Sequence, residues 1–174
     1  MPPPPDQDYN GVIIISNRVG SYALNWHFME IAMRQALGEK ILPSLKSDNF
    51  RTESHITEPA RTGLLADAIS WMVQPHATDP APLNLSQPWQ DSYPTGGNLP
   101  SDAVMAPISR LALPRHGSRP NTTPSSPWPK AQPLPGAVNV SFYDGHSETV
   151  KLDALWQIYW HKDYVPPAKR PGLK

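Results

Sequence analysis

The 174-residue sequence contains no cysteine. This absence excludes disulfide bonds, zinc sites built on thiolates and cysteine nucleophiles. It does not indicate in which cellular compartment the protein lies, because many exported proteins also lack cysteine.

The sequence also lacks an excess of charge of either sign. Fifteen Lys and Arg residues balance fifteen Asp and Glu residues, and the formal net charge at pH 7 is zero. A nucleic-acid-binding domain is expected to carry a basic surface, and a polybasic membrane anchor a basic cluster. The composition therefore predicts no nucleic-acid partner and no electrostatic attachment to a membrane surface.

Long apolar runs are missing as well. The longest purely aliphatic run is Val12 to Ile15, far too short to cross a bilayer. The start, Met1 followed by four prolines, has neither the basic region nor the apolar region of a signal peptide. We expect no signal and no membrane segment in this chain, and it stays open whether the chain is a fragment of a longer protein.

Proline, in contrast, is abundant, with 23 residues in the chain, and only 39% of the residues are apolar. So many prolines keep most of the chain out of regular helices and central strands, while six tryptophans can fasten loops onto a small core. We therefore expect an α+β fold, with a small antiparallel sheet, a C-terminal hairpin, a short helix and long Pro-rich loops. Residues 1–10 read as a flexible arm, and residues 11–174 as one globular domain with a Pro-rich insertion at 117–135.

Local patterns predict several elements before this insertion. The best helix candidate covers residues 21–40, where apolar residues fall roughly on one face and Gly38 follows the expected end. An alternative stays open, in which residues 18–25 form a strand. The remaining expectations are a strand at 11–16, an extended segment at 53–56, a turn at 58–62, a strand at 63–67 and a core segment at 69–73.

The C-terminal third carries the clearest pattern. Val138, Val140 and Phe142 alternate with polar residues, which is the period of a strand with one buried face. Asp144-Gly145 then predicts a two-residue type I′ turn. The chain is expected to return antiparallel through residues 146–151.

A short amphipathic helix is expected to follow this hairpin. Leu152, Leu155, Trp156 and Tyr159 recur at the spacing of one helical face, so Trp156 is expected in the core. Pro166 and Pro167 prevent any further regular structure.

His116 and the triplet Asp144-Gly145-His146 resemble the motif of the prepilin-type processing-associated family, which is named for a His, nine residues and Asp-Gly. Residues 21–25, 58–67, 139–146 and 155–161 resemble further segments of that family, in the same order. The chain departs from the pattern in two respects. Twenty-seven residues, 117–143, separate His116 from Asp144, and the N-terminal cleavage motif and long apolar helix of the family are not found here.

The resemblance implies a pilin-like globular domain, a relative of type II secretion major pseudopilins. It implies a structural subunit or accessory of a type II secretion or type IV pilus-like filament, and not an enzyme. The implied partners are other pseudopilin subunits or secretion and pilus assembly proteins. The implied location of the full-length parent is the bacterial cell envelope, periplasmic or extracellular. His116, Asp144, Gly145 and His146 are then structural residues that pin the C-terminal hairpin.

The same polar residues are also the candidates for chemistry. His116, Asp144 and His146, with His161, are residue types that bind divalent metals or transfer protons. Asp is, however, also common in turns, because its side chain bonds nearby backbone amides. No cofactor is expected, although related pseudopilins carry a loop calcium site for which Asp144 is the only ligand that we name.

A second hypothesis uses aromatic side chains. Trp128, Trp89 and Tyr93 lie in Pro-rich segments and are candidates for an exposed platform that binds a glycan or a Pro-rich peptide. Trp128 is expected to be partly exposed or to anchor its loop. The chain has neither a nucleophile elbow nor a phosphate-binding loop, so a metal-dependent enzyme ranks third.

Overall fold

The computed structural model describes residues 21–38, 48–69, 72–85, 107–118 and 127–174. The expected arm at 1–10 and the expected strand at 11–16 lie outside these residues. Within the described parts, no helix has the length and apolar character needed to cross a bilayer.

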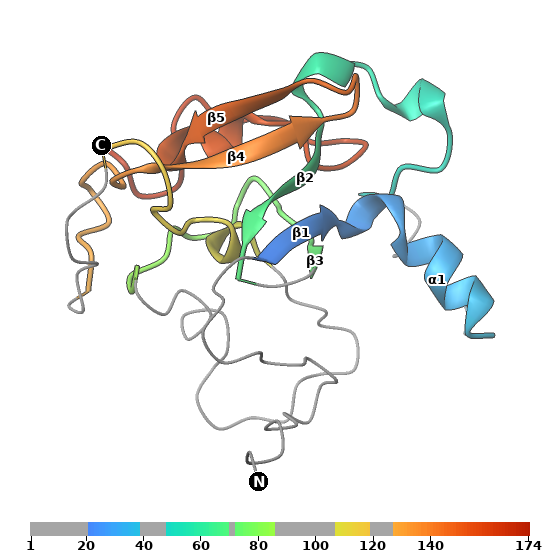
Figure 1. The fold of residues 1–174 in the computed structure, drawn as a ribbon, viewed down its shortest axis with the longest axis horizontal. Helices are drawn as coiled ribbons and strands as arrows, with labels where there is room; N and C mark the ends of the chain where they lie inside the picture. Colours follow the sequence, from blue (N-terminus) through green and yellow to red (C-terminus); the bar gives the residue numbers. More distant parts are fainter. Residues whose placement is uncertain (1–20, 39–47, 70–71, 86–106, 119–126) are drawn as a thin grey trace, which may run out of the picture.

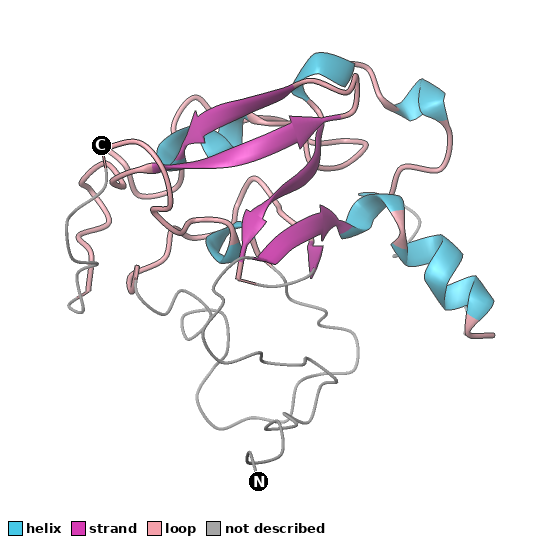
Figure 2. Ribbon diagram, in the orientation of Figure 1, coloured by secondary structure: helices cyan, strands magenta, loops and turns pink. Residues whose placement is uncertain are grey.

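The described residues form one five-stranded sheet with a few short helices, which confirms the α+β class (Figures 1 and 2). The strand order is β3-β1-β2-β4-β5, and three of the four strand pairs are antiparallel. The remaining pair, β1 with β3, is parallel, so the sheet is mixed and mostly antiparallel. The strands are β1 (Ser21–Asn25), β2 (Gly63–Ala68), β3 (Met72–Val73), β4 (Ala137–Phe142) and β5 (Ser147–Lys151).

The first half of the expected helix at 21–40 is wrong, and the strand alternative is right. Residues 21–25 are β1, followed by the short 3₁₀ helix η1 (Trp26–Phe28) and the α-helix α1 (Glu30–Ala36). Asn25 ends the strand, because its buried side chain accepts a hydrogen bond from the His27 backbone N–H and so caps η1.

Three shorter helices lie in the loops that the structure describes. The expected extended segment at 53–56 is wrong: η2 (Glu53–His55) is a 3₁₀ turn. The expected turn at 58–62 is confirmed as η3 (Pro59–Arg61), which begins with proline. The third of these helices is η5 (Ile108–Arg110).

The C-terminal hairpin is confirmed, but its turn differs from the expected one. The Phe142 N–H donates to the His146 carbonyl at 2.9 Å, and the Gly145 N–H donates to the Phe142 carbonyl at 3.0 Å. The loop therefore has three residues, Tyr143 to Gly145, and Gly145 takes the left-handed conformation with φ at +95°. A three-residue loop that ends in a left-handed glycine is the next most common hairpin after the two-residue type.

The expected short helix after the hairpin is η6 (Leu152–Gln157), which has 3₁₀ geometry and ends before Tyr159. Trp156 is fully buried, as expected, and Trp160 is buried beside it in the core. Both indole N–H groups are satisfied: that of Trp156 donates to the Asp79 carbonyl at 2.9 Å, and that of Trp160 to the Leu155 carbonyl at 2.8 Å. Large buried rings with bonded N–H groups hold the loops on the sheet.

The C-terminal tail fastens the described part of the Pro-rich segment. Arg170 is buried, and its guanidinium bonds the Asp153 carboxylate of η6. The same guanidinium donates to the backbone carbonyls of Lys130 and Gln132. These bonds tie residues 130–132 to the helix and to the chain end, which lies near the start of β4 (Figure 1).

Candidate functional site

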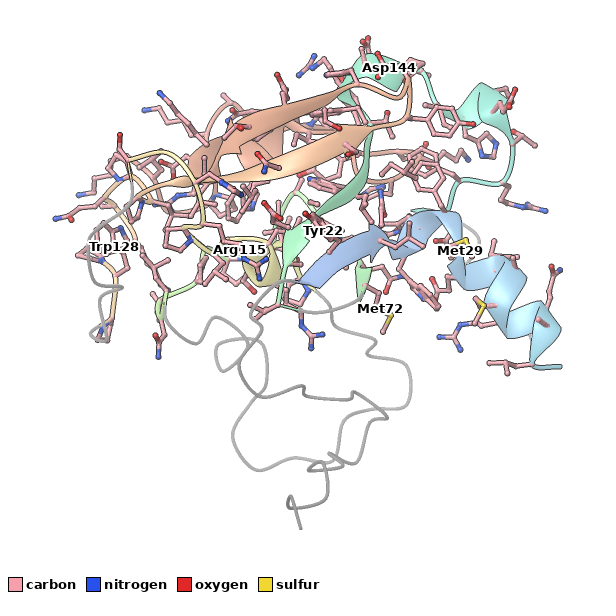
Figure 3. The ribbon with its side chains drawn as sticks, viewed as in Figure 1. Tyr22, Met29, Met72, Arg115, Trp128 and Asp144 are labelled. Carbon is pink, nitrogen blue, oxygen red and sulfur yellow. The ribbon has the colours of Figure 1, made fainter. Side chains whose placement is uncertain are left out.

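The structure does not bring the motif residues into one cluster. His116 pairs with Ala137, the first residue of β4, while Asp144 lies beyond the last residue of that strand. A six-residue strand spans roughly 17 Å at about 3.3 Å per residue. Figure 3 shows Asp144 at the turn of the hairpin, and Arg115, the neighbour of His116, well away from that turn.

His116 joins the base of the hairpin to the middle of the sheet. Its backbone exchanges two hydrogen bonds with Ala137, at 2.8 and 2.9 Å. Its Nε2 lies 3.0 Å from Oδ2 of Asp67 on β2, and the same oxygen accepts the Asn139 N–H at 2.8 Å. The half-exposed imidazole therefore covers a carboxylate that is almost fully buried in the sheet.

Arg115 completes this arrangement. Its guanidinium donates to the Ala68 carbonyl at 2.6 Å and lies 3.9 Å from the Asp67 carboxylate. Burial lowers the pKa of Arg115, while the Asp67 carboxylate acts in the opposite direction. A carboxylate, an arginine and a histidine in this arrangement connect β2 to β4.

Asp144 and His146 contact each other across the turn. The Asp144 carboxylate accepts a hydrogen bond from the His146 backbone at 3.2 Å and lies 2.6 Å from Nδ1 of the same residue. The hydrogen bond with the His146 side chain is the main cause that lowers the pKa of Asp144. The His146 ring stacks on Phe142 with the ring centres 4.5 Å apart. Both side chains are exposed, and their bonds fix the turn.

Metal binding finds little support in the residues that the structure describes. Among them, no group of three or more His, Asp or Glu side chains is arranged to hold a metal ion. His116 and Asp144 are at different ends of β4, and His161 lies elsewhere. Asp144, the predicted calcium ligand, pairs with His146, and the described residues place this pair in no larger group that could hold a metal ion.

The aromatic candidates are only partly covered by the structure. Trp89 and Tyr93 lie outside the described residues. Trp128 is half-buried and packs against the core, so it anchors its loop. Its indole nitrogen is buried without a hydrogen-bond partner among the described residues.

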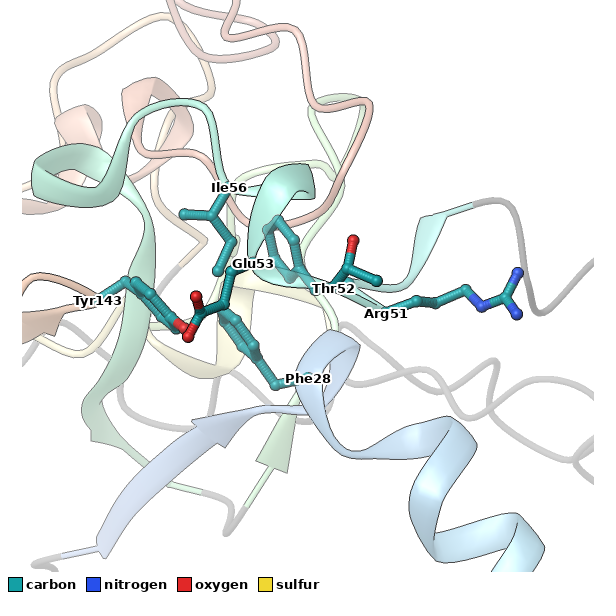
Figure 4. Close-up of a pocket in the computed structure, with 7 residues that line it drawn as sticks. Phe28, Arg51, Thr52, Glu53, Ile56 and Tyr143 are labelled. Carbon is teal, nitrogen blue, oxygen red and sulfur yellow. The ribbon is translucent and has the colours of Figure 1, made fainter.

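A different group of aromatic rings lines a hollow of about 290 Å³ (Figure 4). Phe28 stacks on Phe50 with the ring centres 4.4 Å apart, and on Tyr143 with the centres 5.6 Å apart. Phe28, Glu53 and Tyr143 point toward one another in Figure 4. Sequence reasoning missed this site, because its rings come from η1, from the segment before η2 and from the hairpin turn. The remaining lining residues are Arg51, Thr52 and Ile56.

Three histidines form a second unexpected cluster, the histidine junction (His27, His76 and His161). Their ring centres lie 5.1 to 5.3 Å apart in all three pairs. His27 is almost fully buried, and neither of its ring nitrogens has a hydrogen-bond partner among the described residues. The three positions are far apart in the sequence, so no local pattern marks them.

Comparison with family models, with curated proteins and with solved structures finds no match to this chain.

Proposed function

We propose that this chain is the globular part of a structural subunit or accessory of a type II secretion or type IV pilus-like filament, without enzymatic activity. The observation that carries the proposal is the use of the motif residues at the two ends of one hairpin. His116 joins the hairpin base to Asp67, and Asp144-Gly145 closes its turn. Residues used in this way serve the shape of a domain, as an assembly role requires.

The helix α1 supports an assembly role independently of the motif. It projects from the sheet (Figure 1), and Met29, Met33 and Leu37 lie along it at intervals of four residues. All three side chains are exposed, and Leu37 is 69% exposed. Aligned apolar side chains on a helix surface are typical of protein contacts. The proposed partners are other pseudopilin subunits or assembly proteins, in a periplasmic or extracellular position of the bacterial cell envelope.

The test is formaldehyde cross-linking of cells that express the gene product, followed by immunoblotting. We expect a ladder at multiples of the subunit mass. The double substitution Met33→Lys and Leu37→Lys should shorten the ladder, because it places charge in the contact. Gln35→Lys is the matched control, since Gln35 is exposed on the same helix but on the opposite side. A monomer band alone, or equal ladders for both variants, would contradict the proposal.

A second candidate function is an envelope or extracellular binding module that uses exposed aromatics, and the hollow beside Tyr143 favours it. Stacked rings offer a surface for the apolar face of a sugar, while Thr52 and Glu53 offer hydrogen-bonding groups at its edge. A glycan is therefore the ligand class that fits best.

A glycan array with the purified chain tests this candidate. Tyr143→Ala should weaken binding at least about tenfold, because it removes one aromatic wall of the hollow. Tyr22→Ala is the control, since Tyr22 is 62% exposed but lies outside the hollow. If no glycan binds, or if Pro-rich peptides bind instead, the glycan assignment is wrong.

A further inference from the structure

The histidine junction holds together three segments that are distant in the sequence. His27 lies in η1, His76 follows β3, and His161 lies in the tail after η6. Residues 48–50 bind two of these segments through their backbone. The Phe50 N–H donates to the His27 carbonyl at 3.0 Å, and the Lys162 N–H donates to the Asp48 carbonyl at 3.0 Å.

The three rings of the junction offer no negative charge that could stabilise a protonated imidazole. Burial is the main cause that lowers the pKa of His27 to about 3, and the nearby His161 and His76 lower it further. The Pro75 backbone and the Asn49 side chain act in the opposite direction, but without hydrogen-bond geometry to either ring nitrogen. Burial also lowers the pKa of His161, to about 4, with His76 as the second cause. The packed form of the junction is therefore its neutral form.

The surrounding charges do not neutralise His27. Asp48 lies 3.8 Å from Nε2 of His76, and both side chains are more than 40% exposed, so solvent screens this pair. The buried Glu30 carboxylate is already bonded by Arg34, Asn49 and Gln74. The charged and titratable groups around the junction are Glu30 and Arg34 on α1, Asp48, Asp79 after His76, and Lys162, Asp163 and Tyr164 in the tail.

We propose that the histidine junction is an acid-sensitive latch, which opens residues 48–50 away from η1 and the tail when its imidazoles become protonated. The sheet is not part of the latch, because its strands are joined by their own backbone ladders. Opening moves Phe50 away from Phe28, on which it stacks. The hollow beside Tyr143 therefore loses one wall at acid pH and regains it at neutral pH.

Hydrogen exchange on the full chain, followed by NMR between pH 7.5 and 4.5, tests this proposal. The protection factors of the Phe50 and Lys162 amides should fall as the pH is lowered. After correction for the intrinsic exchange rate, each proton taken up on opening should lower them about tenfold per pH unit. The amides of Val138 and Val140 in β4 should stay more strongly protected than these two amides at every pH in this range, because they exchange only when the whole sheet opens.

Two variants separate the latch from general acid sensitivity. His27→Phe removes the most buried titrating group and should reduce the slope at Phe50 and Lys162 by about one proton. If this variant does not fold, His161→Gln, at a partly buried position of the junction, should reduce the slope by about one proton. His146→Gln is the control and should leave the slope unchanged, because His146 lies at the hairpin turn.

Three results would overturn the proposal. The first is constant protection at Phe50 and Lys162 down to pH 4.5. The second is equal protection of the β4 amides and of Phe50 and Lys162 at every pH, which would mean that the junction opens only by global unfolding. The third is stoichiometric Zn²⁺ binding that shifts the His27 and His161 resonances at neutral pH, because the junction would then be a metal site.

Discussion

Replacement of Asn25 by alanine is expected to destabilise the fold strongly. The Asn25 side chain is fully buried where β1 ends, and its Nδ2 donates to the Gly63 and Trp160 carbonyls, both at 2.8 Å. Its Oδ1 accepts the His27 N–H at 3.2 Å. This one amide therefore joins β1, β2 and the C-terminal tail.

The loss of unfolding free energy can be estimated from the backbone groups that lose their hydrogen-bond partner. Asn25→Ala removes a partner from two buried carbonyls and one backbone N–H, and each such loss costs about 1–3 kcal/mol. Partial relaxation makes about 3–5 kcal/mol a reasonable sum, which is a large part of the roughly 5–15 kcal/mol that stabilises a typical domain. Asn25→Asp should be at least as destabilising at neutral pH, because a carboxylate would face both carbonyls.

Urea unfolding, followed by tryptophan fluorescence and circular dichroism, measures this effect. The midpoint should fall while the slope with urea stays constant. Gln35→Ala is the control, because that amide is exposed on α1, and it should change the free energy of unfolding by less than about 0.5 kcal/mol. A loss below about 1 kcal/mol for Asn25→Ala would refute the reasoning that this side chain ties the three segments together.

Three further predictions concern the same fold. Gly63→Ala should lower the free energy of unfolding by about 1–3 kcal/mol, because the new methyl group would lie 2.6 Å from the buried Trp160 ring; an unchanged thermal midpoint would contradict this. Arg170→Leu should cost about 3 kcal/mol, since it leaves the Asp153 carboxylate without its buried partner, and limited proteolysis should then cut near residues 130–132 faster than in the wild type. The free energy of unfolding should fall as the pH drops below about 6.5, because His27 and His161 take up protons more readily in the unfolded chain. Its slope should approach about 1.4 kcal/mol per pH unit for each histidine, and urea titrations at pH 7, 6 and 5 that give equal values would contradict it.

The C-terminal hairpin could be predicted because its signals are local. Val138, Val140 and Phe142 alternate with polar residues, and one buried face is enough to fix a strand and its register. The loop length was not predictable from Asp144-Gly145, because both the two-residue and the three-residue loops accept a glycine in the left-handed conformation.

The segment at 21–25 shows where local signals fail. Leu24 and Phe28 fit a helical face, yet β1 forms there because Ala23 packs in the core and Asn25 bonds residues from β2 and the tail. These contacts are between residues 38 and 135 positions apart, and tertiary contacts of that kind override helix propensity.

The sites were hidden from sequence reasoning for the same reason. His116 was identified as important, but its partner is Asp67 on β2 and not the Asp144 of its own motif. His161 was considered with the wrong partners, because His27 and His76 come close to it only through the fold. No spacing rule connects such positions in a single sequence.

Immunogold electron microscopy of material sheared from the cell surface tests the central claim most directly. With antibodies against the globular part, the proposed assembly role predicts gold along filaments, and loss of those filaments when the gene is deleted. Detection of the protein only as a monomer, with no labelled filament and no change on deletion, would contradict it.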